Sequence, residues 1–223
     1  MKPKLTLTFL KQAARDFVKK LSRSGLKELY GVTDGKAIGT YVEHKFHDYL
    51  TRNYTYGIGS SASGIDFPKL NVDLKVTSIR QPQSSCPFKS ASQKVYGLGY
   101  HLLVFVYEKM DRHARRVTYL RFHQAIFVQK EHTGDYQATK GILDILNKDG
   151  NKDDIETFLL ERNLPLDDIG RERLARKILQ RPPKLGYLTV SNALQWRLQY
   201  GRIVSIVQQG GKEGVENLLT RAG

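Results

Sequence analysis

The chain has 223 residues, of which 40% are hydrophobic and 26% charged, the composition of a soluble globular protein with one substantial domain. Lys and Arg outnumber Asp and Glu by 36 to 22, a net charge of +14, so nucleic acid is the first partner to consider. A basic surface without a specific partner is the alternative. The basic residues are spread along the chain and no apolar run is long enough to cross a bilayer, which argues against a membrane protein.

Cys86 is the only cysteine, which excludes an intramolecular disulfide and a cysteine-based zinc site. The first twenty residues, "MKPKLTLTFLKQAARDFVKK", have a short apolar patch followed at once by lysines and no small-residue cleavage site. We therefore interpret them as the start of the folded structure and not as a signal peptide. A reducing cytoplasm is the expected location.

The first fifty residues have the pattern of two helices. Apolar residues recur every three or four positions from Leu10 until Gly31, which predicts one helix. A second helix is predicted from Thr33 or Asp34, either of which can cap it, to Leu50. Glu43 stands beside the apolar stripe of this second helix.

Strands are expected between residues 54 and 128. Residues 54–67 are strand-like but interrupted by Gly and Ser, and residues 68–71 form a turn before the alternating segment "VDLKVTS". A Pro/Ser/Gln loop and a short helix, "SASQKVYGLG", follow. The apolar run "YHLLVFVYEK" predicts a buried central strand, and "RRVTYLRFHQAIFV" predicts another strand.

The remainder of the chain is predicted to be mainly helical. Three helical segments lie between residues 138 and 180, and Pro182-Pro183 ends them. A further helix-like piece and a final strand, "GRIVSIVQQ", are expected in the tail. The order of elements predicts an α/β core with a mixed sheet in residues 1–130 and an elaboration in residues 131–223, packed on the core or part of the same domain.

The segment "GIDFPKLNVDLKVTS", residues 64–78, carries the strongest functional signal. Residues two apart in a strand share a face, so Asp73 and Lys75 point away from the core side of the alternating strand. Asp66, on a neighbouring strand across the turn, can reach the same face. Two carboxylates this close favour a cation between them, and their oxygen atoms suit Mg²⁺. Lys75 beside the metal can orient or deprotonate a water and stabilise charge on a phosphate under attack.

These residues resemble the PD-(D/E)xK nuclease signature, with Asp66 followed by Asp73-Leu74-Lys75 and preceded by the helix that carries Glu43. Gly64-Ile65 stands where the signature has Pro. The resemblance covers residues 36–128. It implies a sheet flanked by helices in the order αβββαβ, with Mg²⁺ held by Asp66 and Asp73. Within the superfamily the chain is most similar to type II restriction endonucleases.

Two further groups of side chains belong near this site. Glu43 is predicted as a third acid or, alternatively, as a surface ion-pair partner, while Glu43, His44 and His47 lack the spacing of a zinc motif. The short helix is similar to one that carries a polar residue beside the site in many members, which assigns Gln93 a supporting role. Lys94 is a candidate DNA contact, or else a solvated lysine.

The tail holds residues of the types that read base edges. Arg makes paired hydrogen bonds to guanine and Gln to adenine, and the candidates are Arg197, Arg202, Gln208 and Gln209. The alternative for each of them is a contact with a DNA phosphate or no contact with DNA.

The sequence thus predicts a Mg²⁺-dependent endonuclease that cuts double-stranded DNA at a short specific sequence, a type II restriction enzyme. The resemblance leaves a homodimer open and implies a cognate methyltransferase acting on the same site. A basic DNA-binding regulator with structural acids, and a structure-specific nuclease such as a junction resolvase or repair nickase, are the alternatives.

Overall fold

The computed structural model describes residues 1–57, 64–86, 89–191 and 197–220. Two helices open the chain, α1 (Leu7–Leu21) and α2 (Gly35–Asn53). Asp34 caps α2, as predicted, because its side chain accepts hydrogen bonds from the backbone N–H groups of Lys36 and Ala37. The expectation that the first helix continues to Gly31 is wrong: Leu26 instead pairs by two backbone hydrogen bonds with Thr118 of the sheet.

The central sheet has the strand order β1-β3-β4-β7. Its strands are β1 (Val72–Ser78), β3 (His101–Arg112), β4 (Val117–Val128) and β7 (Val215–Asn217). β1 runs parallel to β3, and the other pairs are antiparallel. The short helix α3 (Gln93–Tyr96) lies between β1 and β3 in the chain. The predicted strands at residues 72–78, 100–109 and 115–128 and the short helix are confirmed.

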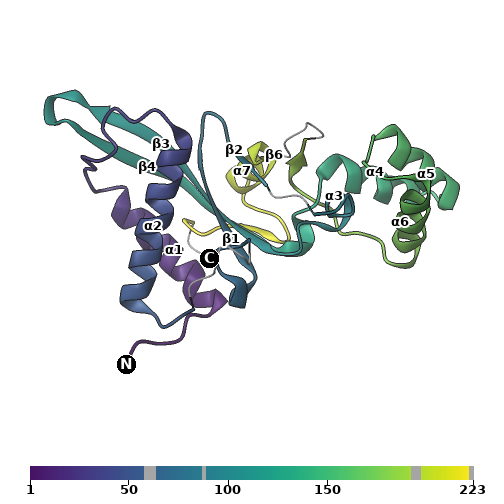
Figure 1. The fold of residues 1–223 in the computed structure, drawn as a ribbon, viewed down its shortest axis with the longest axis horizontal. Helices are drawn as coiled ribbons and strands as arrows, with labels where there is room; N and C mark the ends of the chain where they lie inside the picture. The colour runs from purple at the N-terminus through teal and green to yellow at the C-terminus, as the bar shows by residue number, and fades with distance from the viewer. Residues whose placement is uncertain (58–63, 87–88, 192–196, 221–223) are drawn as a thin grey trace.

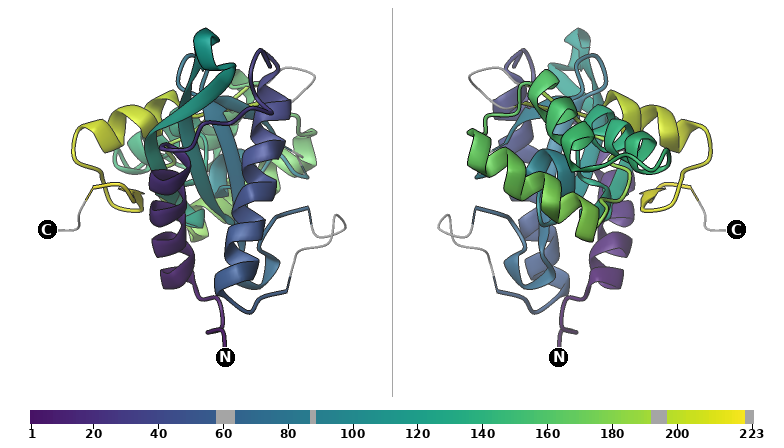
Figure 2. Two further views of the ribbon diagram at one scale, coloured as in Figure 1. Left: turned by 90° about the vertical axis from the view of Figure 1, so that its left-hand side faces the viewer. Right: turned by 90° about the vertical axis from the view of Figure 1, so that its right-hand side faces the viewer.

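Alternation along β3 places two hydrophobic cores on opposite faces of the sheet. Leu103 and Phe105 pack with α1 and α2, whereas Val104 and Val106 pack with elements from the C-terminal part. In the left view of Figure 2, α1 and α2 lie in front of the sheet, and the yellow C-terminal helix lies to the left of them. A strand buried on both faces accounts for the unbroken apolar run in the sequence.

A second, smaller sheet has the order β2-β6-β5, from β2 (Gln83–Ser85), β6 (Arg197–Gln199) and β5 (Thr189–Val190). The chain continues into α7 (Gly201–Gln208). The prediction of a final strand over "GRIVSIVQQ" is therefore wrong. A helix buries Ile203, Val204, Ile206 and Val207 together and exposes Ser205, which alternation in a strand would not achieve. Part of the helix-like piece expected before α7, residues 192–196, lies outside the described residues, as do residues 58–63 of the expected strand-like segment.

Three helices form a lobe at one end of the molecule, shown in green in Figure 1: α4 (Tyr136–Leu146), α5 (Lys152–Glu161) and α6 (Asp168–Gln180). They enclose a third core that includes Val95 of α3, so the lobe is attached next to the segment that follows β2. The helices predicted here from the sequence are confirmed. Within the described residues, no helix is long and apolar enough to span a membrane.

The predicted class, an α/β fold with a mixed sheet flanked by helices, is confirmed. The division into residues 1–130 and 131–223 stays a prediction. β7 and the small sheet return the chain to the neighbourhood of β1 and β4, so the two parts share the second core.

Candidate active site

β1 presents one charged pair beside the core. Val72 and Leu74 are buried in the core shared with α1 and α2, as expected from their period of two. Asp73 and Lys75 alternate with them, and Lys75 Nζ lies 2.8 Å from Asp73 Oδ2. The Asp73 side chain is only 4% exposed, so this ion pair is largely removed from water.

Asp66 reaches the pair through a tight turn. Phe67 and Val72 form a single β-bridge, Pro68–Leu70 form a turn of 3₁₀ helix, and Asn71 closes the turn in the left-handed conformation. Asp66 Oδ2 then accepts a hydrogen bond of 2.8 Å from the backbone N–H of Leu74. Among the described residues Asp66 lies in no strand, so the expected second strand is reduced here to one bridge.

Burial and neighbouring charges shift the pKa values of the two aspartates in this cluster in opposite directions. Burial raises the pKa of Asp73 to about 7, although the neighbouring Lys75 opposes the shift. For Asp66, burial also disfavours the charged form, but hydrogen bonds from His47, Asp73 and the Leu74 N–H outweigh it and lower its pKa. Burial alone would lower the pKa of Lys75, yet Asp73 and then Asp66 and Glu43 raise it. The net effect raises the pKa of Lys75, which favours its ammonium form.

α2 contributes two residues to the same neighbourhood. Glu43 is half-buried, and burial followed by the charge of Asp66 raises its pKa, while Lys75 and His47 act in the opposite direction. His47 Nε2 lies 3.8 Å from Asp66 Oδ1, and its ring stacks on Phe67. Sequence reasoning considered His47 only for zinc and missed its contact with Asp66. The signal was its position one turn after Glu43.

The donor set fits a hard cation with few protein ligands. Asp73 Oδ2 is buried. It is paired with Lys75 but has no hydrogen-bond partner in the described part of the chain. No group of three or more His, Cys, Asp or Glu side chains that could hold a metal occurs among those residues. Two carboxylates without a third ligand suit Mg²⁺, which usually retains several waters and takes other oxygens from a substrate phosphate.

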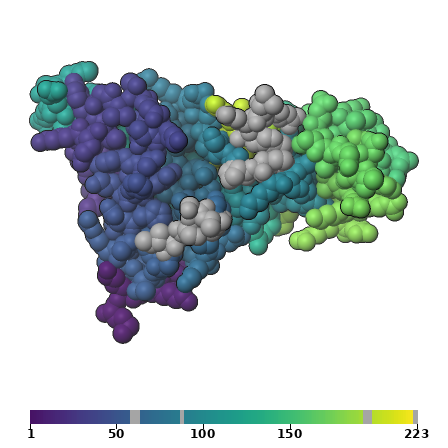
Figure 3. Space-filling view, in the orientation of Figure 1, coloured from purple at the N-terminus to yellow at the C-terminus, as the bar shows by residue number. Residues whose placement is uncertain are grey.

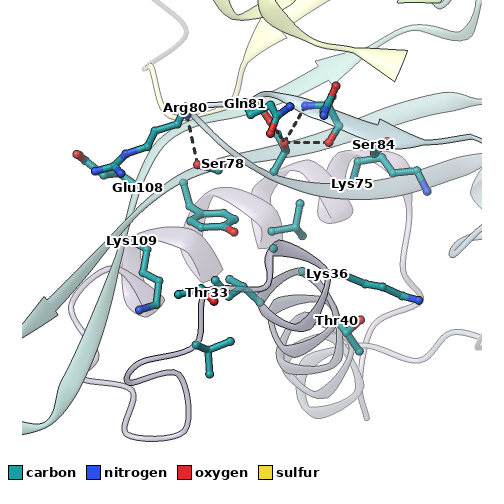
Figure 4. Close-up of a pocket in the computed structure, with 18 of the residues that line it drawn as sticks. Thr33, Lys36, Thr40, Lys75, Ser78, Arg80, Gln81, Ser84, Glu108 and Lys109 are labelled. Carbon is teal, nitrogen blue, oxygen red and sulfur yellow. Dashed lines mark hydrogen bonds between the residues drawn. The ribbon is translucent and has the colours of Figure 1, made fainter. Parts of the chain in front are cut away.

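The site opens into a cleft of about 900 Å³. Its walls are the first half of α2, the second half of β1, the segment 80–85, and the outer part of β3, and both Glu43 and Lys75 line it. Figure 4 shows Lys36 and Thr40 of α2 on one wall, with Lys75 and Ser84 on the other. Lys36, Arg80, Lys109 and Arg197 add positive charge to the lining. Glu108 and Asp111 also line the cleft, and Asp111 is paired with Lys109, so the excess of positive charge comes from Lys36, Arg80 and Arg197 together with Lys75. On the face seen in Figure 3, α2 lies toward one end and the helical lobe at the other.

Gln93 and Lys94 lie at α3, apart from this cleft lining. The Gln93 amide accepts hydrogen bonds from the backbone N–H groups of Lys89 and Ser90 and donates one to the Leu98 carbonyl. These contacts hold its own loop together. Lys94 is buried, which lowers its pKa, and is not the solvated lysine considered from the sequence.

The tail residues divide into two places. Arg197 is exposed on β6 and lines the cleft with Lys75. Arg202, on α7, lies with its guanidinium 3.5 Å from the centre of the Tyr136 ring. Gln208 and Gln209 are exposed at the end of α7, and neither lines the cleft.

The structure thus combines an α/β core with a buried acid–lysine cluster beside a basic cleft. Known proteins similar to this chain show which family it belongs to. Residues 4–217 match the family model described as type II restriction enzyme NspV. The match spans nearly the whole chain, and the chain belongs to this family of restriction enzymes. The prediction of a type II restriction enzyme is confirmed.

One relative is the type II restriction enzyme NspV of Nostoc sp. (strain ATCC 29411 / PCC 7524). It is 57% identical to this chain over 187 residues, which are 84% of each protein. No solved structure shows a significant match to the chain.

Proposed function

We propose that the chain is a Mg²⁺-dependent endonuclease that hydrolyses phosphodiester bonds in double-stranded DNA at a short specific sequence. The observation that carries this proposal is the convergence of Asp66, Asp73 and Lys75 in the first half of β1 and the turn before it. Lys75 and Glu43 of this cluster line the adjoining cleft, while the two aspartates lie outside its lining. Membership of a restriction enzyme family supports it. We further propose that the core is of the PD-(D/E)xK type, since its acid pair, its lysine and the preceding helix with Glu43 follow that pattern.

In this proposal Asp66 and Asp73 hold the metal, which supplies charge neutralisation at the phosphate and activation of water. Asp73 must lose its proton for this task, because a protonated carboxyl group is a poor ligand. The Leu74 N–H and His47 keep Asp66 ionised and oriented. Asp73 on β1 and Asp66 beside it are therefore both placed to bind the metal.

Lys75 acts on the phosphate and not on the protein fold. Its ammonium group is kept protonated by Asp73, Asp66 and Glu43, and it lines the cleft. A fixed positive charge in a partly dry site stabilises the negative charge that grows on the phosphate oxygens during attack. Glu43, on the opposite wall, is proposed as a supporting acid that completes the negative field around the metal.

Incubation with several long duplex DNAs, with Mg²⁺ or with EDTA, tests the function. Discrete fragments with Mg²⁺ and intact DNA with EDTA are expected. A smear would indicate a nonspecific nuclease, and cleavage confined to branched or nicked substrates would indicate a structure-specific enzyme. Intact DNA that is shifted in a gel under all conditions would instead indicate a DNA-binding regulator.

A further inference from the structure

The small sheet beside the active site has two unlike faces. β2 and β6 are antiparallel, with Gln83 opposite Gln199, Ser84 opposite Leu198, and Ser85 opposite Arg197. Directly opposed residues share a face of the sheet, and neighbours along a strand alternate. Gln83, Ser85, Arg197 and Gln199 therefore lie on one face, and Ser84 and Leu198 lie on the other.

The second face anchors this ribbon to the core. Leu198 is fully buried with Val190 of β5 in the second hydrophobic core, and the Ser84 hydroxyl is hydrogen-bonded to that of the buried Tyr200. The first face buries nothing comparable: Ser85, Arg197 and Gln199 are exposed, and Gln83 is half-exposed. The four polar side chains of the first face thus stand on a backbone that is fixed by the packing of the second face.

The position of the ribbon relative to the active site is fixed by hydrogen bonds to β1. Thr77 Oγ1 accepts a hydrogen bond from the Gln83 N–H, 3.0 Å away, and donates one to the Gln83 carbonyl, 3.2 Å away. Thr77 follows Lys75 by two residues on the same strand. Gln83, Ser85 and Arg197 of the polar face line the cleft that contains Lys75 and Glu43, as does Ser84, whereas Gln199 lies outside the lining. Whatever occupies the cleft at Lys75 therefore meets the part of the polar face formed by Gln83, Ser85 and Arg197.

We propose that the polar face of the β2–β6 ribbon reads base edges in the major groove next to the scissile phosphate, an inference that rests on the proposed DNA cleavage. The major groove admits a two-stranded ribbon, and both Arg and Gln can make paired hydrogen bonds to a base, to guanine and adenine respectively. The pair Gln83 and Gln199 and the pair Ser85 and Arg197 lie about 7 Å apart along the ribbon, the rise of two residues in a strand. That distance matches about two base-pair steps, so the ribbon reads a few adjacent base pairs.

The test compares sequence selectivity, not only activity. Duplexes with a randomised segment are offered to the full-length protein, and the sequences bound with Ca²⁺ and those cut with Mg²⁺ are determined separately. Arg197→Lys keeps the charge but replaces the rigid planar guanidinium group by a single flexible ammonium group, and Gln199→Ala removes an amide. Each should reduce discrimination at one position of the target by about 5- to 150-fold and leave the other positions unchanged. Gln12→Ala, an exposed glutamine of α1 that does not line the cleft, is the matched control.

Other outcomes of this experiment distinguish a failure of base reading by the ribbon from a failure of the proposed DNA cleavage. If the wild-type protein selects and cuts a sequence, while Arg197→Lys and Gln199→Ala keep its full profile, the ribbon does not read bases. An equal loss at all positions on Arg197→Ala, without any change on Arg197→Lys, would make Arg197 a phosphate contact and overturn base reading there. If the wild-type protein neither selects nor cuts any duplex, the proposed function and this inference both fail.

Discussion

Asp66 Oδ2 accepts a hydrogen bond of 2.8 Å from the backbone N–H of Leu74, the residue between Asp73 and Lys75. This bond ties an acid outside the strand to the strand that carries the other two charged groups. It also orients Asp66 beside the Asp73 carboxyl group, whose buried Oδ2 is paired with Lys75.

Asp66→Asn should abolish Mg²⁺-dependent cleavage and leave the protein folded. Asn keeps an oxygen that can accept from the Leu74 N–H, but the negative charge that attracts the metal is lost. Cleavage assays and thermal unfolding of the purified variant measure both effects. DNA binding with Ca²⁺ should persist in the wild-type protein without cleavage. Full activity of Asp66→Asn, or of the wild-type protein in EDTA, would contradict the assignment of the metal ligands.

Lys75→Ala should lower the cleavage rate by at least about a thousandfold, the scale of losing one preorganised electrostatic group. DNA affinity should change much less, because one positive charge among many contributes little to binding over a basic surface. Single-turnover cleavage and binding measured on the same duplex separate the two effects. A folded variant that cuts at the wild-type rate would end the assignment of this site.

The metal-free protein should lose stability as the pH rises between about 4 and about 7. The folded-state pKa of Asp73 is raised to about 7 from the ordinary value of 3.8, so the folded state binds more protons than the unfolded state in this window. Asp66 has the opposite shift, which acts only at more acidic pH. Urea unfolding in EDTA at pH 5 and pH 8 should therefore show a smaller pH dependence for Asp73→Asn than for the wild-type protein. Equal pH dependence in the two proteins would show that Asp73 is ionised in the metal-free fold.

Lys36→Ala should weaken binding to all DNA sequences alike. Lys36 and Glu43 both line the cleft from α2, and seven residues of helix separate them by about 10 Å, so Lys36 is placed to meet a phosphate beside the one that is cut. The slope of log binding constant against log salt should become shallower by about 0.9. Lys45→Ala, on the same helix but outside the cleft lining, serves as the control and should leave the slope unchanged. A loss restricted to one target position would instead assign Lys36 to base recognition.

The strand that carries Asp73 and Lys75 was predictable because the information that specifies it is local. Period-two alternation alone places Asp73 and Lys75 on one face and Val72 and Leu74 on the other, and Pro68 to Asn71 have the composition of a turn. The family match confirms the resemblance to type II restriction enzymes, which was drawn from this segment. The sequence alone therefore determined the class of protein and the centre of its candidate site.

The tertiary structure decided what surrounds that centre. The segment "GRIVSIV" suits a strand or a helix, and only the shape of the second core selects the helix that buries Ile203, Val204 and Val207 on one side. β2 and β6 are three residues each, too short for a recognisable period, and are more than a hundred positions apart in the chain. Their pairing depends on the burial of Leu198, and it is this long-range packing that brings Gln83 and Arg197 to the cleft beside Lys75.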